Sequence, residues 1–124
     1  MKRILDVGQC DHDHGLMTRL AREAGAEITR AATAEEALSK LRETTFDLVW
    51  VNRMFDADNS FGLELIKRMK SDPKLSQLPV MLISNFESAQ NEAVSVGALP
   101  GLGKDHLREP VTLQRVKTAL NLFS

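Results

Sequence analysis

Two short runs in this chain are apolar at nearly every position, and they constrain the fold more than any other feature. Residues 47–51 read Asp-Leu-Val-Trp-Val, and residues 79–83 read Pro-Val-Met-Leu-Ile. A strand with one face in water alternates apolar and polar residues, whereas a strand covered on both faces is apolar throughout. The two runs therefore predict central strands of a parallel sheet with a layer of helices on each face.

Weaker strand and helix patterns surround these two runs. Further strands are predicted at residues 4–7, 27–31 and 106–108, and helical spacing of apolar residues occurs at 16–24, 37–41, 63–69, 89–96 and 113–120. Residues 98–104 are rich in Gly and Pro and are interpreted as a loop or a distorted edge. Five alternations with short links favour an α/β fold with a doubly wound, five-stranded parallel sheet, formed by a single domain over residues 1–124. In such a sheet, chemistry is expected at the carboxyl ends of the central strands.

Charge and cysteine content exclude several classes of function. The chain has 16 Lys and Arg against 17 Asp and Glu, a formal charge of −1, so we expect no nucleic-acid partner and no anionic membrane surface. Cys10 is the only cysteine and cannot form an internal disulfide, which favours a reducing compartment. Asp6 interrupts the first apolar stretch, and no stretch is long enough to span a bilayer, so neither a signal peptide nor a membrane segment is expected. We expect a cytoplasmic protein.

Five phrases along the chain resemble the receiver domain of bacterial two-component response regulators. They are KRILDV at residues 2–7, FDLVWV at 46–51, GLELI at 62–66, LPVMLIS at 78–84 and EPVTL at 109–113. Each phrase is a weak signal alone, but their order and spacing are similar to the family over essentially the whole chain. The resemblance implies a flavodoxin-like (CheY-like) fold and a signalling module rather than an enzyme.

The chain departs from the family at most of the positions that carry the family's reaction. In the family, two acids after the first strand bind Mg²⁺, an aspartate ending the third strand accepts a phosphoryl group, and a hydroxyl ending the fourth strand and a lysine bind its oxygens. Matching without gaps places Gly8 and Gln9 at the acidic pair and Asn52 at the acceptor, while Ser84 retains the hydroxyl. An amide nitrogen cannot attack phosphorus, and Mg²⁺ requires oxygen ligands that this pair supplies poorly. We therefore predict a degenerate receiver with no catalytic residue, no metal and no cofactor.

The lysine position has two interpretations. Counting forward from residues 97–98 places Lys104 at the lysine and Gly101 at the family's switch aromatic. Counting back from the final helix instead places Glu109 and His106 at these positions, with an insertion of about five residues, which loops tolerate well. We prefer Glu109, because the phrase EPVTL and the following helix match the family without a gap.

A glutamate at this position would suit a pocket that has lost its acids. A lysine there would lack a counter-charge, whereas Glu109 could accept hydrogen bonds from the amides of Asn52 or Gln9. We therefore predict a hydrogen-bonded plug of Gln9, Asn52, Ser84 and Glu109. On this interpretation, restoring aspartate at Asn52 alone should not restore phosphorylation.

The expected function is a pseudo-receiver that acts by protein–protein contact without phosphorylation. The family commonly associates through the face formed by its fourth helix, fifth strand and fifth helix, here residues 89–96, 106–108 and 113–122. A kinase, a motor, another regulator or a second copy of the chain would be a typical partner.

Two alternatives remain open from the sequence. The first is an atypical receiver phosphorylated at another acid, such as Asp56 or Asp58 in the lengthened loop. The second is a metal-binding flavodoxin-like protein that uses a run of possible ligands, Cys10, Asp11, His12, Asp13 and His14. The simpler interpretation of this run is that Asp11 or Asp13 caps the first helix while the histidines are solvated.

Overall fold

The computed structural model describes residues 1–122 and confirms the predicted alternation of strands and helices. The elements are β1 (Lys2–Val7), α1 (Asp11–Glu23), β2 (Ala26–Ala31), α2 (Ala34–Glu43), β3 (Leu48–Asn52), α3 (Gly62–Ser71), β4 (Val80–Ile83), α4 (Glu87–Ser95), β5 (Leu99–Leu102), the 3₁₀ helix η1 (Lys104–His106) and α5 (Pro110–Leu120). The five strands pair in parallel in the order β2-β1-β3-β4-β5, so the flavodoxin-like fold is confirmed.

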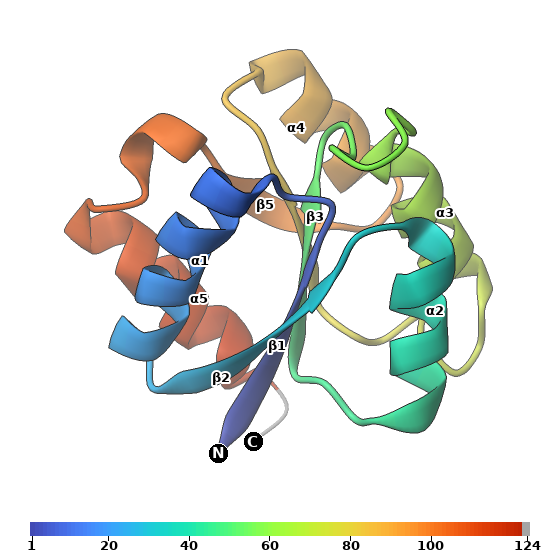
Figure 1. The fold of residues 1–124 in the computed structure, drawn as a ribbon, viewed down its shortest axis with the longest axis horizontal. Helices are drawn as coiled ribbons and strands as arrows, with labels where there is room; N and C mark the ends of the chain where they lie inside the picture. Colours follow the sequence, from blue (N-terminus) through green and yellow to red (C-terminus); the bar gives the residue numbers. More distant parts are fainter. Residues whose placement is uncertain (123–124) are drawn as a thin grey trace.

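Two apolar layers hold the sheet between helices. On one face, α1 and α5 pack against residues such as Ile4 and Trp50, and on the other face α2, α3 and α4 pack against residues such as Val49 and Leu82 (Figure 1). Every residue of β3 and β4 is buried, as their apolar runs predicted. Trp50 is fully buried, which confirms its predicted place in the core.

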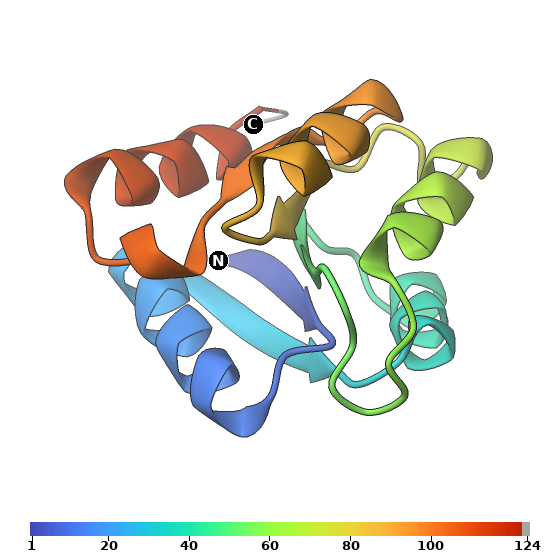
Figure 2. The same cartoon turned by 90° about the horizontal axis from the view of Figure 1, so that it is seen from above.

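The strand order positions the candidate site. The chain passes from β1 to β2 on one side and then returns to β3 on the other side of β1, which makes the β1–β3 boundary the switch point of the sheet. Loops that follow strands on either side of such a point diverge and leave a crevice at the carboxyl edge. Figure 2 views this edge from above, with the segments that follow β1, β3 and β4 meeting near its centre.

The predicted fifth strand at residues 106–108 is wrong. The strand is Leu99–Leu102, inside the segment whose Gly and Pro content indicated a loop. β5 is an edge strand, where proline is tolerated because its missing N–H can face away from the ladder. Gly101 allows a close approach, since a Cβ there would lie 2.0 Å from the Leu82 carbonyl oxygen. The Gly and Pro signals therefore reflect an irregular sheet edge, and His106 lies instead in η1.

No helix among residues 1–122 combines the length and the apolar character needed to cross a bilayer.

Candidate functional site

A cavity of about 300 Å³ opens at the carboxyl ends of β3 and β4. Asn52 ends β3 and pairs in register with Ile83 of β4, so Ser84 follows directly beside it. Asn52, Ser84 and Lys104 line the cavity, and Arg53 and Phe86 are also among its walls. The structure thus brings together Asn52 and Ser84, which the sequence predicted to lie in the site, and Lys104, the alternative candidate for the lysine position.

The amide of Asn52 is held by two backbone carbonyls. Its Nδ2 donates to Gly8 O at 3.0 Å and to Met54 O at 2.8 Å. Two carbonyl oxygens can accept only from the nitrogen end of the amide, so the orientation of the side chain is determined. Oδ1 consequently remains without a hydrogen-bond partner among the described residues, on a side chain that is 7% exposed. An ionised aspartate here would place a carboxylate oxygen against the carbonyl oxygens of Gly8 and Met54, which would repel it.

Phe55 fills the space beside Gly8 in which an acidic side chain would extend. Gly8 has a φ of +81°, and a Cβ at this residue would lie 2.1 Å from Cδ1 of the fully buried Phe55 ring. The ring is held by a tight loop in which Phe55 N donates to Ser60 O at 2.8 Å and Met54 bridges Phe61. Phe55 was not among the predicted site residues, although a large aromatic residue beside the lengthened loop is a signal of burial.

Gln9 does not face Asn52 in a hydrogen-bonded plug. It is buried, and neither atom of its side-chain amide makes a hydrogen bond of ordinary length within the described residues. It lies instead close to Asp6, whose Oδ2 contacts His14 Nδ1 at 2.7 Å. Burial raises the pKa of Asp6 to about 6, although His14 and the Gln9 amide both act to lower it. Asp6 Oδ1 and Trp50 Nε1 are likewise buried without a partner among the residues described.

Lys104 has a counter-charge that the sequence analysis missed. Its Nζ donates to Oδ2 of Asp13 at 2.8 Å, and both side chains are partly buried. Burial on its own raises the pKa of the Asp13 carboxyl, but the hydrogen bond and charge of Lys104 hold it below its usual range. The contact forms because η1 carries the chain from the end of β5 to the side of α1 (Figure 2).

Glu109 lies outside the cavity, so the predicted plug is wrong. It is the N-cap residue of α5, its side chain is half exposed, and its carboxylate contacts the ring of His106. β5 ends at Leu102 and Lys104 enters the cavity, which agrees with the forward count. The forward count assigns the family's switch-aromatic position to Gly101, whereas the backward count assigned it to His106.

The run of possible metal ligands is dispersed over different partners. Asp11 pairs with Arg30 at 2.8 Å, while Asp13 and His14 are engaged elsewhere. Within residues 1–122, no group of three or more His, Cys, Asp or Glu side chains could hold a metal ion. The capping prediction is also wrong, because Cys10 is the N-cap of α1 and makes no side-chain capping bond.

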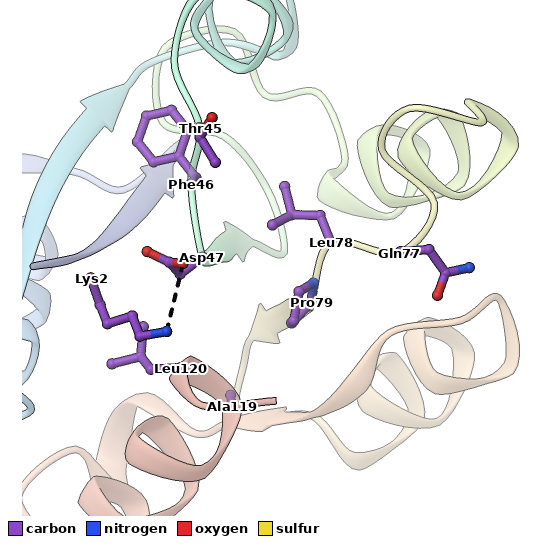
Figure 3. Close-up of a pocket in the computed structure, with 9 residues that line it drawn as sticks. All are labelled: Lys2, Thr45, Phe46, Asp47, Gln77, Leu78, Pro79, Ala119 and Leu120. Carbon is purple, nitrogen blue, oxygen red and sulfur yellow. Dashed lines mark ion pairs between the residues drawn. The ribbon is translucent and has the colours of Figure 1, made fainter. Parts of the chain in front are cut away.

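A second cavity of about 270 Å³ lies at the opposite, amino edge of the sheet (Figure 3). Its charged groups are Lys2 and Asp47, whose Nζ and Oδ1 atoms are 4.0 Å apart. The other carboxylate oxygen of Asp47 accepts from the backbone N–H of Arg3 at 2.8 Å. The remaining walls include Phe46, Leu78 and other side chains that bring no further charge (Figure 3). These contacts join the ends of β1 and β3, and we assign the cavity no chemistry.

The chain is similar to regulatory proteins of known sequence and to solved structures of response regulators. No protein-family model matches it. The transcriptional regulatory protein ZraR of Salmonella typhimurium is 29% identical over 118 residues, which cover 93% of this chain and 24% of that protein. The chain thus spans about a quarter of the length of this relative.

Solved structures match over nearly the whole chain. The structure of a response regulator from Chloroflexus aurantiacus matches with a TM-score of 0.84 at 28% identity. The match covers 97% of this chain and 98% of the Chloroflexus chain. The receiver domain of NtrX from Brucella abortus has a TM-score of 0.80 at 22% identity, with 96% and 98% covered, and shows the fold alone. The sheet order and the solved neighbours show the fold of a receiver domain. The similarity to ZraR and to the Chloroflexus structure supports a signalling domain of the response-regulator kind.

Proposed function

We propose that this chain is a pseudo-receiver, a signalling module that works by protein contact without phosphorylation. The observation that carries the proposal is the amide of Asn52, which occupies the acceptor position and donates to Gly8 O and Met54 O. A phosphoryl acceptor needs an available lone pair, and the lone pair of an amide nitrogen is delocalised into its carbonyl group. Both hydrogens of this nitrogen are also engaged, with Gly8 O and Met54 O.

The surroundings of Asn52 support the same conclusion. Mg²⁺ prefers carboxylate and water oxygens in octahedral geometry, but Gly8 brings no side chain and Phe55 packs its ring against it. We assign Lys104 to the lysine position and Gly101 to the switch-aromatic position. The ammonium of Lys104 is paired with Asp13, so the positive charge that would receive a phosphoryl group is already compensated.

We place the partner surface first on the face formed by α4, β5 and α5. Val94 and Val111 are large apolar residues exposed on this face. A mostly apolar cavity of about 330 Å³ lies between β5 and α5 and is lined by Leu99, Pro100, Val111 and others. Exposed apolar surface of this kind marks protein contacts. A cytoplasmic kinase, another regulator or a second copy of the chain would suit it.

The alternative acceptor in the loop has less support. Both the backbone N–H and the hydroxyl of Ser60 donate to Oδ1 of Asp58, at 3.0 and 2.6 Å. The hydroxyl bond, with the backbone bond, lowers the pKa of Asp58, as expected for an aspartate that closes a turn.

Intact-mass spectrometry after incubation with acetyl phosphate and Mg²⁺ tests the proposal. The mass of the native chain should remain unchanged, because no group is positioned to take the phosphoryl group, and Asn52→Asp should behave in the same way. A phosphate adduct on the native chain would overturn the proposal, and its loss in Asp58→Asn would identify the loop as the acceptor. A receiver domain that retains its acids serves as the positive control.

A further inference from the structure

The floor of the cavity presents one hydrogen-bond acceptor and one donor. Asn52 turns Oδ1 away from its two carbonyl partners, and this oxygen accepts from no described residue. Ser84 Oγ accepts from Phe86 N at 3.1 Å, and its hydroxyl hydrogen has no acceptor among the described residues. Both residues are more than nine-tenths buried, and they stand side by side at the ends of paired strands. Asn52 Oδ1 is not one of the described atoms that are both fully enclosed and unpartnered, so it is accessible, and a ligand in the cavity could complete both groups.

The hydrogen-bonding groups of this floor favour a neutral ligand over an ionic one. Lys104 is neutralised by Asp13, so it offers no free positive charge to an anion. A carboxylate has only acceptor atoms and would meet the free oxygen of Asn52, which it cannot satisfy. The guanidinium of Arg53 lines the same cavity, 4.8 Å from the centroid of the Phe86 ring, and has no ion-pair partner among the described residues. It repels a cation and attracts an anion, but an anion would still leave Asn52 Oδ1 without a donor. A neutral group with both a donor and an acceptor fits best.

The rim of the cavity is apolar and exposed. Met54 and Phe86 line the opening and are 39% and 57% exposed, and Phe61, 55% exposed, pairs with Met54 across a short antiparallel bridge. Exposed aromatic and methionine side chains around a small polar hollow are typical of a contact in which one polar side chain is anchored between apolar neighbours.

We propose that this cavity receives the carboxamide of a glutamine or asparagine on a protein partner. The ligand's N–H would donate to Asn52 Oδ1 and its carbonyl would accept from the Ser84 hydroxyl, while apolar residues on either side of it cover Met54, Phe61 and Phe86. The inference deepens the proposed function, because a pocket that accepted phosphate would not be free to hold a neutral side chain. It identifies a contact surface distinct from the face of α4, β5 and α5.

An NMR titration of the full ¹⁵N-labelled chain tests this inference. The probes are three blocked tripeptides, acetyl-Leu-X-Leu-amide, in which X is glutamine, glutamate or methionine. We expect saturable chemical-shift changes of the Arg53, Met54 and Ser84 backbone amides. The glutamine peptide should bind at least about fivefold more tightly than the other two peptides, because one mismatched polar contact weakens binding by about tenfold. In Ser84→Ala the preference should fall to within about twofold, while Ser39→Ala on the exposed side of α2 should retain it.

Several results would overturn the inference. They are the absence of shifts at the cavity, glutamate bound as tightly as glutamine, or shifts confined to β5 and α5. Urea unfolding of Ser84→Ala, followed by fluorescence of the buried Trp50, shows whether that variant is folded. A phosphate adduct in the mass experiment together with a retained glutamine preference would refute only the proposed function. An unchanged mass without that preference would refute only the carboxamide site.

Discussion

Replacing Asn52 by aspartate tests the reasoning about the pocket most directly. The change is nearly isosteric and creates no cavity, but it removes the donors to Gly8 O and Met54 O. Gly8 O still accepts from Asp56 N at 3.0 Å, whereas Met54 O is left without its partner. At a net contribution of about 1 kcal/mol for each hydrogen bond, the loss is about 2 kcal/mol before any charge is considered.

The introduced charge makes this loss depend on pH. A buried carboxylate that faces two carbonyl oxygens is disfavoured, so the pKa of the new aspartate should be raised, at about 1.4 kcal/mol for each unit. A group whose pKa is raised by folding loses stability as the pH rises through its folded pKa. At pH 4.5 the protonated carboxyl can still donate one bond, and we expect a loss of about 1 kcal/mol. At pH 7.5 we expect about 3 to 4 kcal/mol.

Urea unfolding followed by Trp50 fluorescence measures both values, because Trp50 is fully buried and is the only tryptophan. Asn85→Asp is the matched control. Asn85 is exposed near the same cavity, and its Oδ1 already accepts from Asp105 N at 3.0 Å, a bond that a carboxylate keeps. The control should change stability by less than about 0.5 kcal/mol. An Asn52→Asp protein as stable as the native chain at pH 7.5, or equally destabilised at both pH values, would refute the reasoning.

Three further substitutions test the surroundings of the pocket. Burial raises the pKa of Asp6 from 3.8 to about 6, so the native chain loses stability as the pH rises through that range. Asp6→Asn should therefore raise the free energy of unfolding at pH 7.5 by up to about 3 kcal/mol. It should also make the free energy of unfolding vary less with pH between pH 4 and 8. Gly8→Ala should lower the free energy of unfolding in urea by about 3 kcal/mol, because its φ is positive and the new methyl group would overlap the ring of Phe55. The double variant with Phe55→Ala should lose less than the sum of the two single losses, because the overlap is removed. Asp13→Asn should lower the free energy of unfolding by at most about 1 kcal/mol in the same assay, because the ion pair with Lys104 is partly exposed. This loss should be present at neutral pH and should disappear as acid protonates the carboxyl group of the native chain.

The central part of the fold was predictable because local patterns report burial. The apolar runs ending at Val51 and Ile83 could only be strands covered on both faces, and β3 and β4 are buried at every position. The N-cap of α2 follows from similar local chemistry: Thr33 and Glu36 have the spacing of a capping box, and the Thr33 hydroxyl accepts from Glu36 N at 3.2 Å. The other half of that box, a bond from the Glu36 side chain, does not form in the structure.

The edge of the sheet was not predictable by the same means. A central strand is recognised by its apolar side chains, but an edge strand can contain Pro100 and Gly101 and still pair through its backbone. The choice of Glu109 over Lys104 rested on the ungapped match of the phrase EPVTL and the final helix, whereas in the structure Lys104, and not Glu109, lines the cavity. A local match of sequence phrases does not show which side chain of the segment after β5 reaches the cavity, because that depends on the path of the chain through η1.

The sequence by itself determined that residues 8, 9 and 52 are a glycine and two amides, and no fold can make them supply carboxylates to the site. Only the tertiary structure decided what replaced them. It brought Phe55 against Gly8 and paired Lys104 with Asp13, which lies 91 residues away along the chain. Such contacts depend on where separate loops meet in space, and neither spacing nor composition along the chain encodes that meeting.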